Sequence, residues 1–121
     1  MVADADAPAE ATAEVRWREL GRWEGTGDRQ TESFDVASGT LELVWEASRI
    51  PTAHDGAGRL RVSLYSAISG RPLQTIVDTV GVGAGSAYVA DEPRVSYLVI
   101  ESESLAWRVR LDEAVRAGST H

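Results

Sequence analysis

Alternation of apolar and polar residues near the end of the chain constrains the fold more than any other feature. Two alternating runs, Arg94–Ile100 and Leu105–Leu111, flank the polar segment Glu101–Ser104. Successive side chains on a strand point to opposite faces. The second run would therefore bury its tryptophan, valine and leucine on one face and expose its two arginines on the other. We predict two adjacent antiparallel strands, a closing hairpin with one dry and one wet side.

The same pattern recurs upstream and predicts about eight short strands in all. The expected strands are residues 15–20, 33–36, 40–46, 59–64, 73–80 and 86–90, followed by the two closing runs. Glycine- and proline-rich turns separate them, and no segment has the length and period of a core helix. The sequence therefore predicts an all-β fold. We favour a two-sheet antiparallel β-sandwich of jelly-roll type, with a closed barrel as the alternative.

Two tryptophans are expected in the core of this sandwich. Trp45 is in phase with Leu43, and Trp107 is in phase with Val109. Every second residue of a strand turns inward, so both indoles should be sealed between the two layers.

Charged residues predict which strands are neighbours. Glu42 and Glu46 lie on the outward face of one expected strand, and Arg59 and Arg61 lie on the outward face of the next. Opposite charges across adjacent antiparallel strands contribute about 0.2–1 kcal/mol per pair. We therefore expect these two strands to pair, with both arginines facing solvent.

Composition divides the chain into three parts. Residues 1–14 carry four acidic residues and no basic one, and they read as a disordered leader rich in alanine and proline. Residues 15–113 form the expected sandwich domain, and residues 114–121 a frayed tail. The leader lacks the basic start and apolar region of a signal peptide. Leaders of this kind remain when an upstream signal segment is removed, which would place the protein outside the cytoplasm.

Several function classes fit poorly. The net charge of −7 argues against nucleic acid and anionic lipid as partners. The chain contains no run of 18 apolar residues, so we expect no membrane insertion. Cysteine is absent, which excludes thiolate metal ligands and nucleophiles.

Catalytic motifs are also lacking, so we expect neither an enzyme nor a bound cofactor. His54 lies in a loop, His121 is terminal, and no Gly-x-Ser-x-Gly motif accompanies them. The Gly81–Gly85 segment lacks the Lys-Ser/Thr of a phosphate-binding loop and reads as a flexible connector. Loop carboxylates leave a structural calcium ion open, but their spacing matches no calcium-binding motif.

Aromatic residues supply the candidate ligand-binding set: Trp17, Trp23, Tyr65 and Tyr88. Exposed flat rings beside polar groups suit a sugar or a peptide. A carbohydrate-binding module is therefore the alternative to a protein-binding one. Unprotected edge strands at Ser33–Val36 or Ser86–Ala90 would also allow strand addition or a homo-oligomer.

Three motifs of the front half resemble those of small exported bacterial β-sandwich domains, including the pre-peptidase C-terminal domains of secreted enzymes. The motifs are Trp23-Glu24-Gly25, Thr31–Val36 and Leu41–Trp45, with Tyr97–Ser102 and Trp107-Arg108-Val109 as the closing hairpin. The resemblance spans the chain after Val15. It implies a non-catalytic accessory, adhesion or binding module. Our leading hypothesis is a module that binds a protein partner or helps secretion or surface display, because the sandwich pattern comes without a catalytic constellation. The chain departs from these domains in showing no export signal.

Overall fold

The computed structural model describes residues 15–50, 58–90 and 92–116, and these residues form nine strands and no helix. The strands are β2 (Val15–Gly25), β3 (Arg29–Gln30), β4 (Phe34–Val36), β5 (Thr40–Arg49), β6 (Arg59–Ser66), β7 (Pro72–Val80), β8 (Gly83–Ala90), β9 (Arg94–Glu103) and β10 (Leu105–Arg116).

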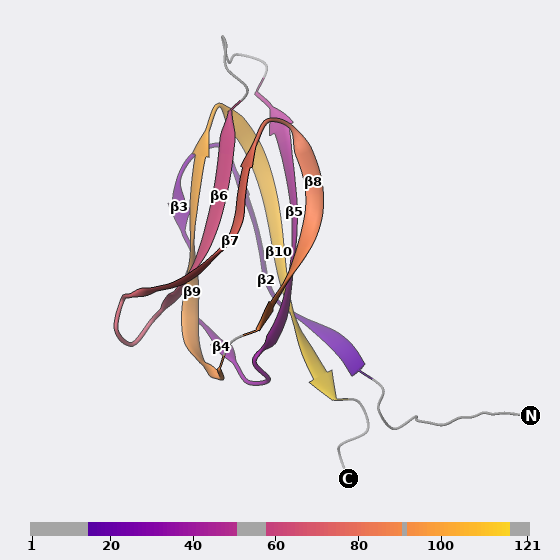
Figure 1. The fold of residues 1–121 in the computed structure, drawn as a ribbon, viewed down its shortest axis with the longest axis vertical. Helices are drawn as coiled ribbons and strands as arrows, with labels where there is room; N and C mark the ends of the chain where they lie inside the picture. The colour runs from indigo at the N-terminus through magenta and orange to yellow at the C-terminus, as the bar shows by residue number, and fades with distance from the viewer. Residues whose placement is uncertain (1–14, 51–57, 91, 117–121) are drawn as a thin grey trace, which may run out of the picture.

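Two antiparallel sheets stack as a sandwich (Figure 1). One sheet has four strands in the order β2-β10-β5-β8. The other has the order β3-β9-β6-β7, with β4 also pairing with β9. The pairs nest outward from the β6–β7 hairpin: β5 with β8, then β3 and β4 with β9, then β2 with β10. A long hairpin rolled up in this way is a jelly roll. The predicted sandwich is confirmed, and the sheets do not close into a barrel.

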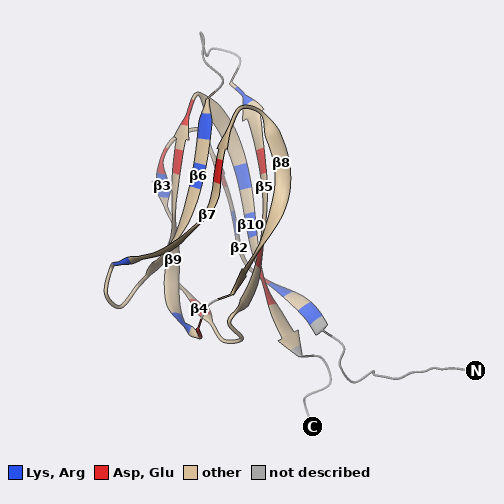
Figure 2. Ribbon diagram, viewed as in Figure 1, with Lys and Arg blue, Asp and Glu red and all other residues tan. Residues whose placement is uncertain are grey.

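The core lies between the sheets and follows the predicted alternation. Its buried members come from both layers: Trp23, Val36, Leu41, Leu43, Ala47, Leu60, Val62, Leu64, Val77, Val89, Leu98, Ile100, Leu105, Trp107, Val109 and Leu111. Arg59 and Arg61 are exposed, and Figure 2 shows two blue segments on β6. Alternation therefore gives the correct face for each of these strands.

The closing hairpin predicted from the last third of the chain is wrong. β9 and β10 are consecutive but belong to different sheets, since β9 pairs with β6 and β10 pairs with β2 and β5. Ser104 joins them with a φ of 61°, in the left-handed region. The chain thus crosses from one layer to the other, and the dry faces of both runs meet the core from opposite sides.

The expected pairing of Glu42 and Glu46 with Arg59 and Arg61 is also wrong. The strands that carry them, β5 and β6, lie in different sheets. The two arginines instead face the acidic residues of β7 and β9. Alternation identifies a face but not the neighbouring strand, and a jelly roll separates successive strands between layers.

Glycines give the large indoles room on the inner face. A Cβ at Gly21 would lie 2.4 Å from the ring of Trp23, and one at Gly25 would lie 3.0 Å from the ring of Trp107. The Trp107 Nε1–H donates to the carbonyl oxygen of Gly27 at 2.9 Å, so this buried polar group is satisfied.

The ends of two predicted segments need correction. Gly83 and Gly85 belong to β8 and do not form a flexible connector; only the turn residue Gly81 has a positive φ, of 89°. β10 continues to Arg116, so residues 114–116 belong to the sheet and not to a frayed tail. The predicted disorder of residues 1–14 lies outside the described residues.

Candidate functional site

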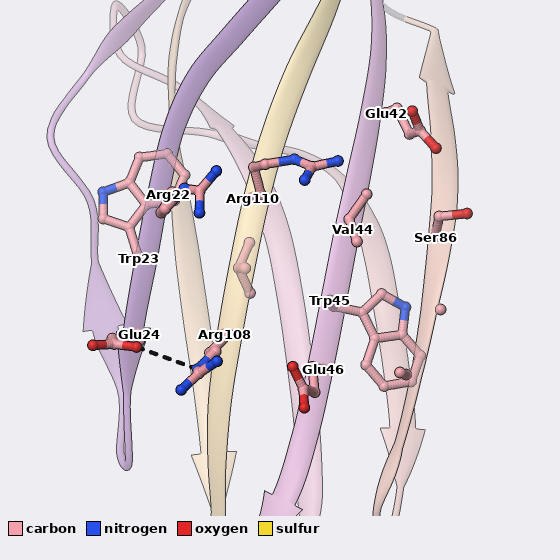
Figure 3. A pocket seen from close by; sticks show the side chains of 13 residues that line it. Arg22, Trp23, Glu24, Glu42, Val44, Trp45, Glu46, Ser86, Arg108 and Arg110 are labelled. Carbon is pink, nitrogen blue, oxygen red and sulfur yellow. Dashed lines mark ion pairs between the residues drawn. The ribbon is translucent and has the colours of Figure 1, made fainter.

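The outer face of the four-stranded sheet is hollowed into a groove of about 900 Å³, which we call the outer groove (Figure 3). All four strands contribute to it, because the ladder register aligns outward side chains in rows across the sheet. One row contains Glu24, Arg108, Glu46 and Ala84, and the next contains Arg22, Arg110, Val44 and Ser86. The groove is therefore floored by charged and small side chains.

The three arginines of the groove each contact an acidic neighbour. The ion pairs are Arg108–Glu24 at 3.3 Å, Arg22–Glu19 at 2.7 Å and Arg110–Asp112 at 3.1 Å. The hydrogen bond from Arg22 holds the pKa of Glu19 below its usual value. A guanidinium has five N–H donors, so each of these pairs leaves donors that can face a ligand.

Two carboxylates of the groove are open. Within the described part of the chain, neither Glu42 nor Glu46 has an ion-pair partner. Both lie on β5, four positions apart, so their Cα atoms are separated by about 13 Å. The groove thus offers acceptors as well as donors along its length.

Trp45 packs against the core but also lines the groove and is only partly buried, so the prediction that it is sealed between the layers holds only in part. Its ring lies over β8, where a Cβ at Gly83 would be 3.6 Å away and one at Gly85 would be 3.2 Å away. β8 is an edge strand and supplies glycines where side chains would cover the indole. Trp107, in contrast, is 2% exposed, as expected.

An exposed aromatic pair stands next to the outer groove. The ring centroids of Trp17 and Tyr88 are 6.1 Å apart, with planes tilted by 49°, and the residues are 42% and 71% exposed. They come from the two edge strands, so their side chains reach toward each other across the outer face. Tyr88 is directly opposite Glu42 in the ladder, which places the pair at one end of the groove.

The other two predicted ligand-binding residues do not join this aromatic pair. Trp23 lines the outer groove (Figure 3) but is only 6% exposed, so it does not present an open ring to a ligand; its Nε1–H donates to Glu32 at 3.2 Å. Tyr65 is on the outer face of the five-stranded sheet, where it stacks on Tyr97 with centroids 5.4 Å apart. The structure brings together two of the four candidates.

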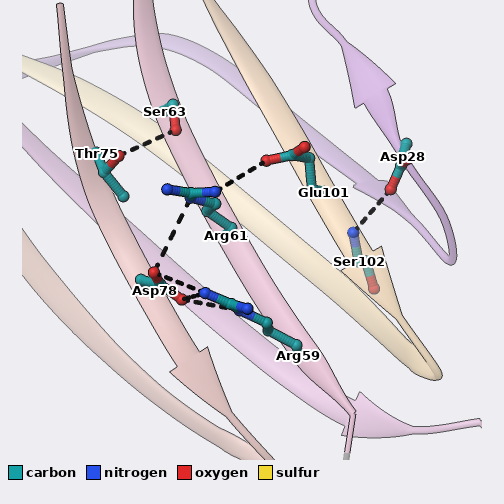
Figure 4. A network of polar contacts seen from close by, with 8 residues as sticks. All are labelled: Asp28, Arg59, Arg61, Ser63, Thr75, Asp78, Glu101 and Ser102. Atoms are coloured by element: carbon teal, nitrogen blue, oxygen red, sulfur yellow. Dashed lines mark hydrogen bonds and ion pairs between the residues drawn. The ribbon is translucent and has the colours of Figure 1, made fainter.

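The outer face of the five-stranded sheet carries a polar network (Figure 4). Arg59 donates to both carboxylate oxygens of Asp78, at 2.9 and 3.0 Å. Arg61 lies 3.9 Å from Asp78 and 4.0 Å from Glu101. These charges satisfy one another across three strands, so this face is a less open surface than the outer groove.

The residues considered for catalysis or metal binding add no site. His54 lies outside the described residues. Among the residues that are described, no group of three or more histidine, aspartate or glutamate side chains could hold a metal ion. Gly83 and Gly85 are strand residues packed against Trp45 and do not open a helix.

Sequence reasoning missed the charged residues of the groove. Alternation predicts outward faces for Arg108, Arg110 and Glu46, but nothing in the sequence indicates that they share one hollow. The signal that could have found them is the pairing order of β10 and β5, which brings strands more than 50 residues apart side by side.

No protein-family model matches the chain, and no curated protein or solved structure matches it. The resemblance to pre-peptidase C-terminal domains therefore stays a hypothesis.

Membrane-spanning helices are not found in the part of the chain that was described.

Proposed function

We propose that this chain is a non-catalytic binding module and that its outer groove binds a carbohydrate chain. The observation that carries the proposal is the exposed Trp17–Tyr88 pair at the end of a hollow lined with open carboxylates and guanidinium groups. Such a module would act as an accessory part of a bacterial protein, in line with the resemblance. Some jelly rolls are lectin domains, but the site and not the fold supports the proposal.

The chemistry of the groove matches a sugar. Aromatic rings stack on the apolar face of a pyranose, and neighbouring polar groups orient it. Hydroxyl groups both donate and accept, so Glu42 and Glu46 can accept from them while Arg108 and Arg110 donate. The lining contains three glutamates and three arginines, and this balance of charge favours a neutral glycan over an anionic one.

The spacing of acidic groups favours binding over hydrolysis. Glycoside hydrolysis uses two carboxyl groups about 5–9.5 Å apart, whereas the Cα atoms of the two unpaired glutamates, Glu42 and Glu46, are about 13 Å apart along β5. Asp112 is directly opposite Glu42, but its side chain is 9% exposed and bound by Arg110. In the Glu42–Asp112 pair only Glu42 is unpaired, and hydrolysis needs both an acid and a second carboxylate.

A glycan array followed by tryptophan fluorescence titration tests the proposal. We expect a neutral polysaccharide to bind and to change the emission of Trp17 and Trp45. Tyr88→Ala should weaken the affinity at least about fivefold, since a lost stacking contact costs about 1 kcal/mol. Tyr65→Ala is the matched control, because it removes the same ring from the opposite face and should leave the affinity unchanged.

Two results would contradict the proposal. An array with no glycan bound would exclude a carbohydrate ligand and favour a protein partner. Loss of binding in Tyr65→Ala with normal binding in Tyr88→Ala would move the site to the Tyr65–Tyr97 face. Circular dichroism of both variants checks that they are folded.

A further inference from the structure

β8 is an edge strand without charge protection. From Val80 to Ala90 the chain contains no charged residue, and β8 is uncoloured along its length in Figure 2. The opposite edge of the same sheet, β2, carries three arginines and two glutamates. Charged side chains on an edge strand prevent pairing with another chain. Of the two edges of this sheet, only β8 is open to strand addition.

Exposed apolar groups accompany this edge. Tyr88 on β8 is 71% exposed, and Val82, just before β8, is 64% exposed. The other outward residues of β8 are Ala84, Ser86 and Ala90, which are small and leave the backbone accessible. The edge thus combines apolar surface with unobstructed main-chain groups.

The direction of the free backbone groups follows from one hydrogen bond. Gln74 on β7 donates its side-chain N–H to the carbonyl oxygen of Ala90 at 3.2 Å, so that carbonyl points away from β5. Backbone groups of a strand alternate in direction. The N–H and C=O groups of Ala84, Ser86 and Tyr88 therefore face the free edge, while those of the residues between them face β5.

We propose that β8 pairs antiparallel with β8 of a second copy of this chain, with Ser86 opposite Ser86 across a two-fold axis. This register places Tyr88 of each copy opposite Ala84 of the other. The three residues with free backbone groups then exchange about six hydrogen bonds, two per pair. The register keeps inward residues opposite inward ones, so the cores of both sandwiches stay on the same side of the joined sheet.

A second copy fits this edge because the edge is self-complementary. The free groups are symmetric about Ser86, and a two-fold interface requires each surface to match itself. No like charges approach across the axis, whereas two copies of β2 would bring arginines together. Pairing joins the two four-stranded sheets into one, with an outer groove on each side of the axis. This inference does not depend on the ligand of the groove.

Light scattering after size exclusion, repeated over a range of concentrations, measures the assembly of the full chain. We expect twice the chain mass for the unmodified protein. Ser86→Lys sets two like charges at the axis, and Ser86→Pro removes the central N–H; both should give the mass of one chain. Ser48→Lys is the control, since it adds the same charge to an exposed position on β5 and should leave the dimer intact.

Amide hydrogen exchange reports the register. The amides of Ser86 and Tyr88 should be protected in the unmodified protein and exchange at least tenfold faster in Ser86→Lys. A single-chain mass for the unmodified protein at all concentrations would overturn the proposal, as would a dimer that persists in Ser86→Lys. If Ser86→Pro unfolds, as circular dichroism would show, Ser86→Lys decides the question.

Discussion

Glu113 is the residue on which three segments of the sandwich depend. Its side chain is fully buried near the end of β10. Its carboxylate accepts the backbone N–H groups of Ala37 and Ser38, at 2.5 and 2.6 Å, and forms an ion pair with Arg18 at 2.5 Å. Burial alone would raise the pKa of Glu113, but the N–H groups and the guanidinium together hold it below the usual value. One carboxylate therefore ties the β4–β5 turn to both β2 and β10.

Glu113→Gln should lower the free energy of unfolding at pH 7 by about 1–3 kcal/mol, because charge-assisted hydrogen bonds are replaced by weaker ones. The folded-state pKa is depressed, so the contribution is present above the unfolded value of about 4.3 and is lost as pH falls through the folded value. Urea unfolding at pH 7 and at decreasing pH measures both effects.

Glu103→Gln provides the comparison, since Glu103 is exposed on β9. It should change stability by less than about 0.5 kcal/mol. A Glu113→Gln variant as stable as Glu103→Gln at pH 7, or a difference that grows as pH falls below 4, would show that the carboxylate is not a stabilising anion.

At the scale of the element, glycine and tryptophan positions on the four-stranded sheet complement each other. Gly21 lies under Trp23, Gly25 under Trp107, and Gly85 under Trp45. In two of these cases the ring is enclosed in the core, whereas at the β8 edge it stays partly open and joins the groove. The same local arrangement thus builds a packed interior in one place and part of the outer groove in another.

Gly21→Ala should destabilise the protein by about 1–3 kcal/mol, the usual cost of overpacking a core. The new Cβ would lie 2.4 Å from the Trp23 ring, which is held by surrounding core residues and by Glu32. Thermal unfolding measures the effect. Gly27→Ala is the matched control, because a Cβ there meets no atom within 4 Å. Equal melting temperatures for the two variants would contradict the packing argument.

The inward face of a strand can be predicted from its sequence, but its neighbouring strands cannot. Period-two alternation identified the inward face of β10, with Trp107 and Val109 buried, because facing is a local property. Strand neighbours are a long-range property. Alternation therefore could not show that β10 leaves β9 at Ser104 and pairs with β2 and β5.

The candidate site shows the same division. Trp17 and Tyr88 were chosen as exposed aromatic residues, and the structure places them together. Trp23 was chosen on the same grounds, but its i−2 glycine makes room for it in the core. For the arginines of the groove, alternation predicts the outward face but not their position on that face. The hollow forms only when strands from both ends of the chain lie side by side.

At the scale of the whole molecule, the jelly roll is closed by its last strand. β10 lies inside the four-stranded sheet, between β2 and β5, although it is the C-terminal strand (Figure 1). The first described strand therefore finds its only ladder partner, among the described residues, at the other end of the sequence. Pairings of such long sequence separation form slowly, typically in milliseconds to seconds. The sheet is complete only when the C-terminal strand inserts.

Removal of residues 105–121 should abolish cooperative unfolding of the entire sandwich, including the five-stranded sheet. The deletion takes away four buried apolar side chains of β10, each contributing about 1.5–3 kcal/mol, against a total domain stability of about 5–15 kcal/mol. It also leaves β2 and β5 without their shared neighbour. Near-ultraviolet circular dichroism and a thermal scan measure the loss. A chain ending at Arg116 keeps β10 whole and should unfold like the complete protein. A sharp transition in the chain ending at Ser104 would mean that the five-stranded sheet folds by itself, against the shared core described above.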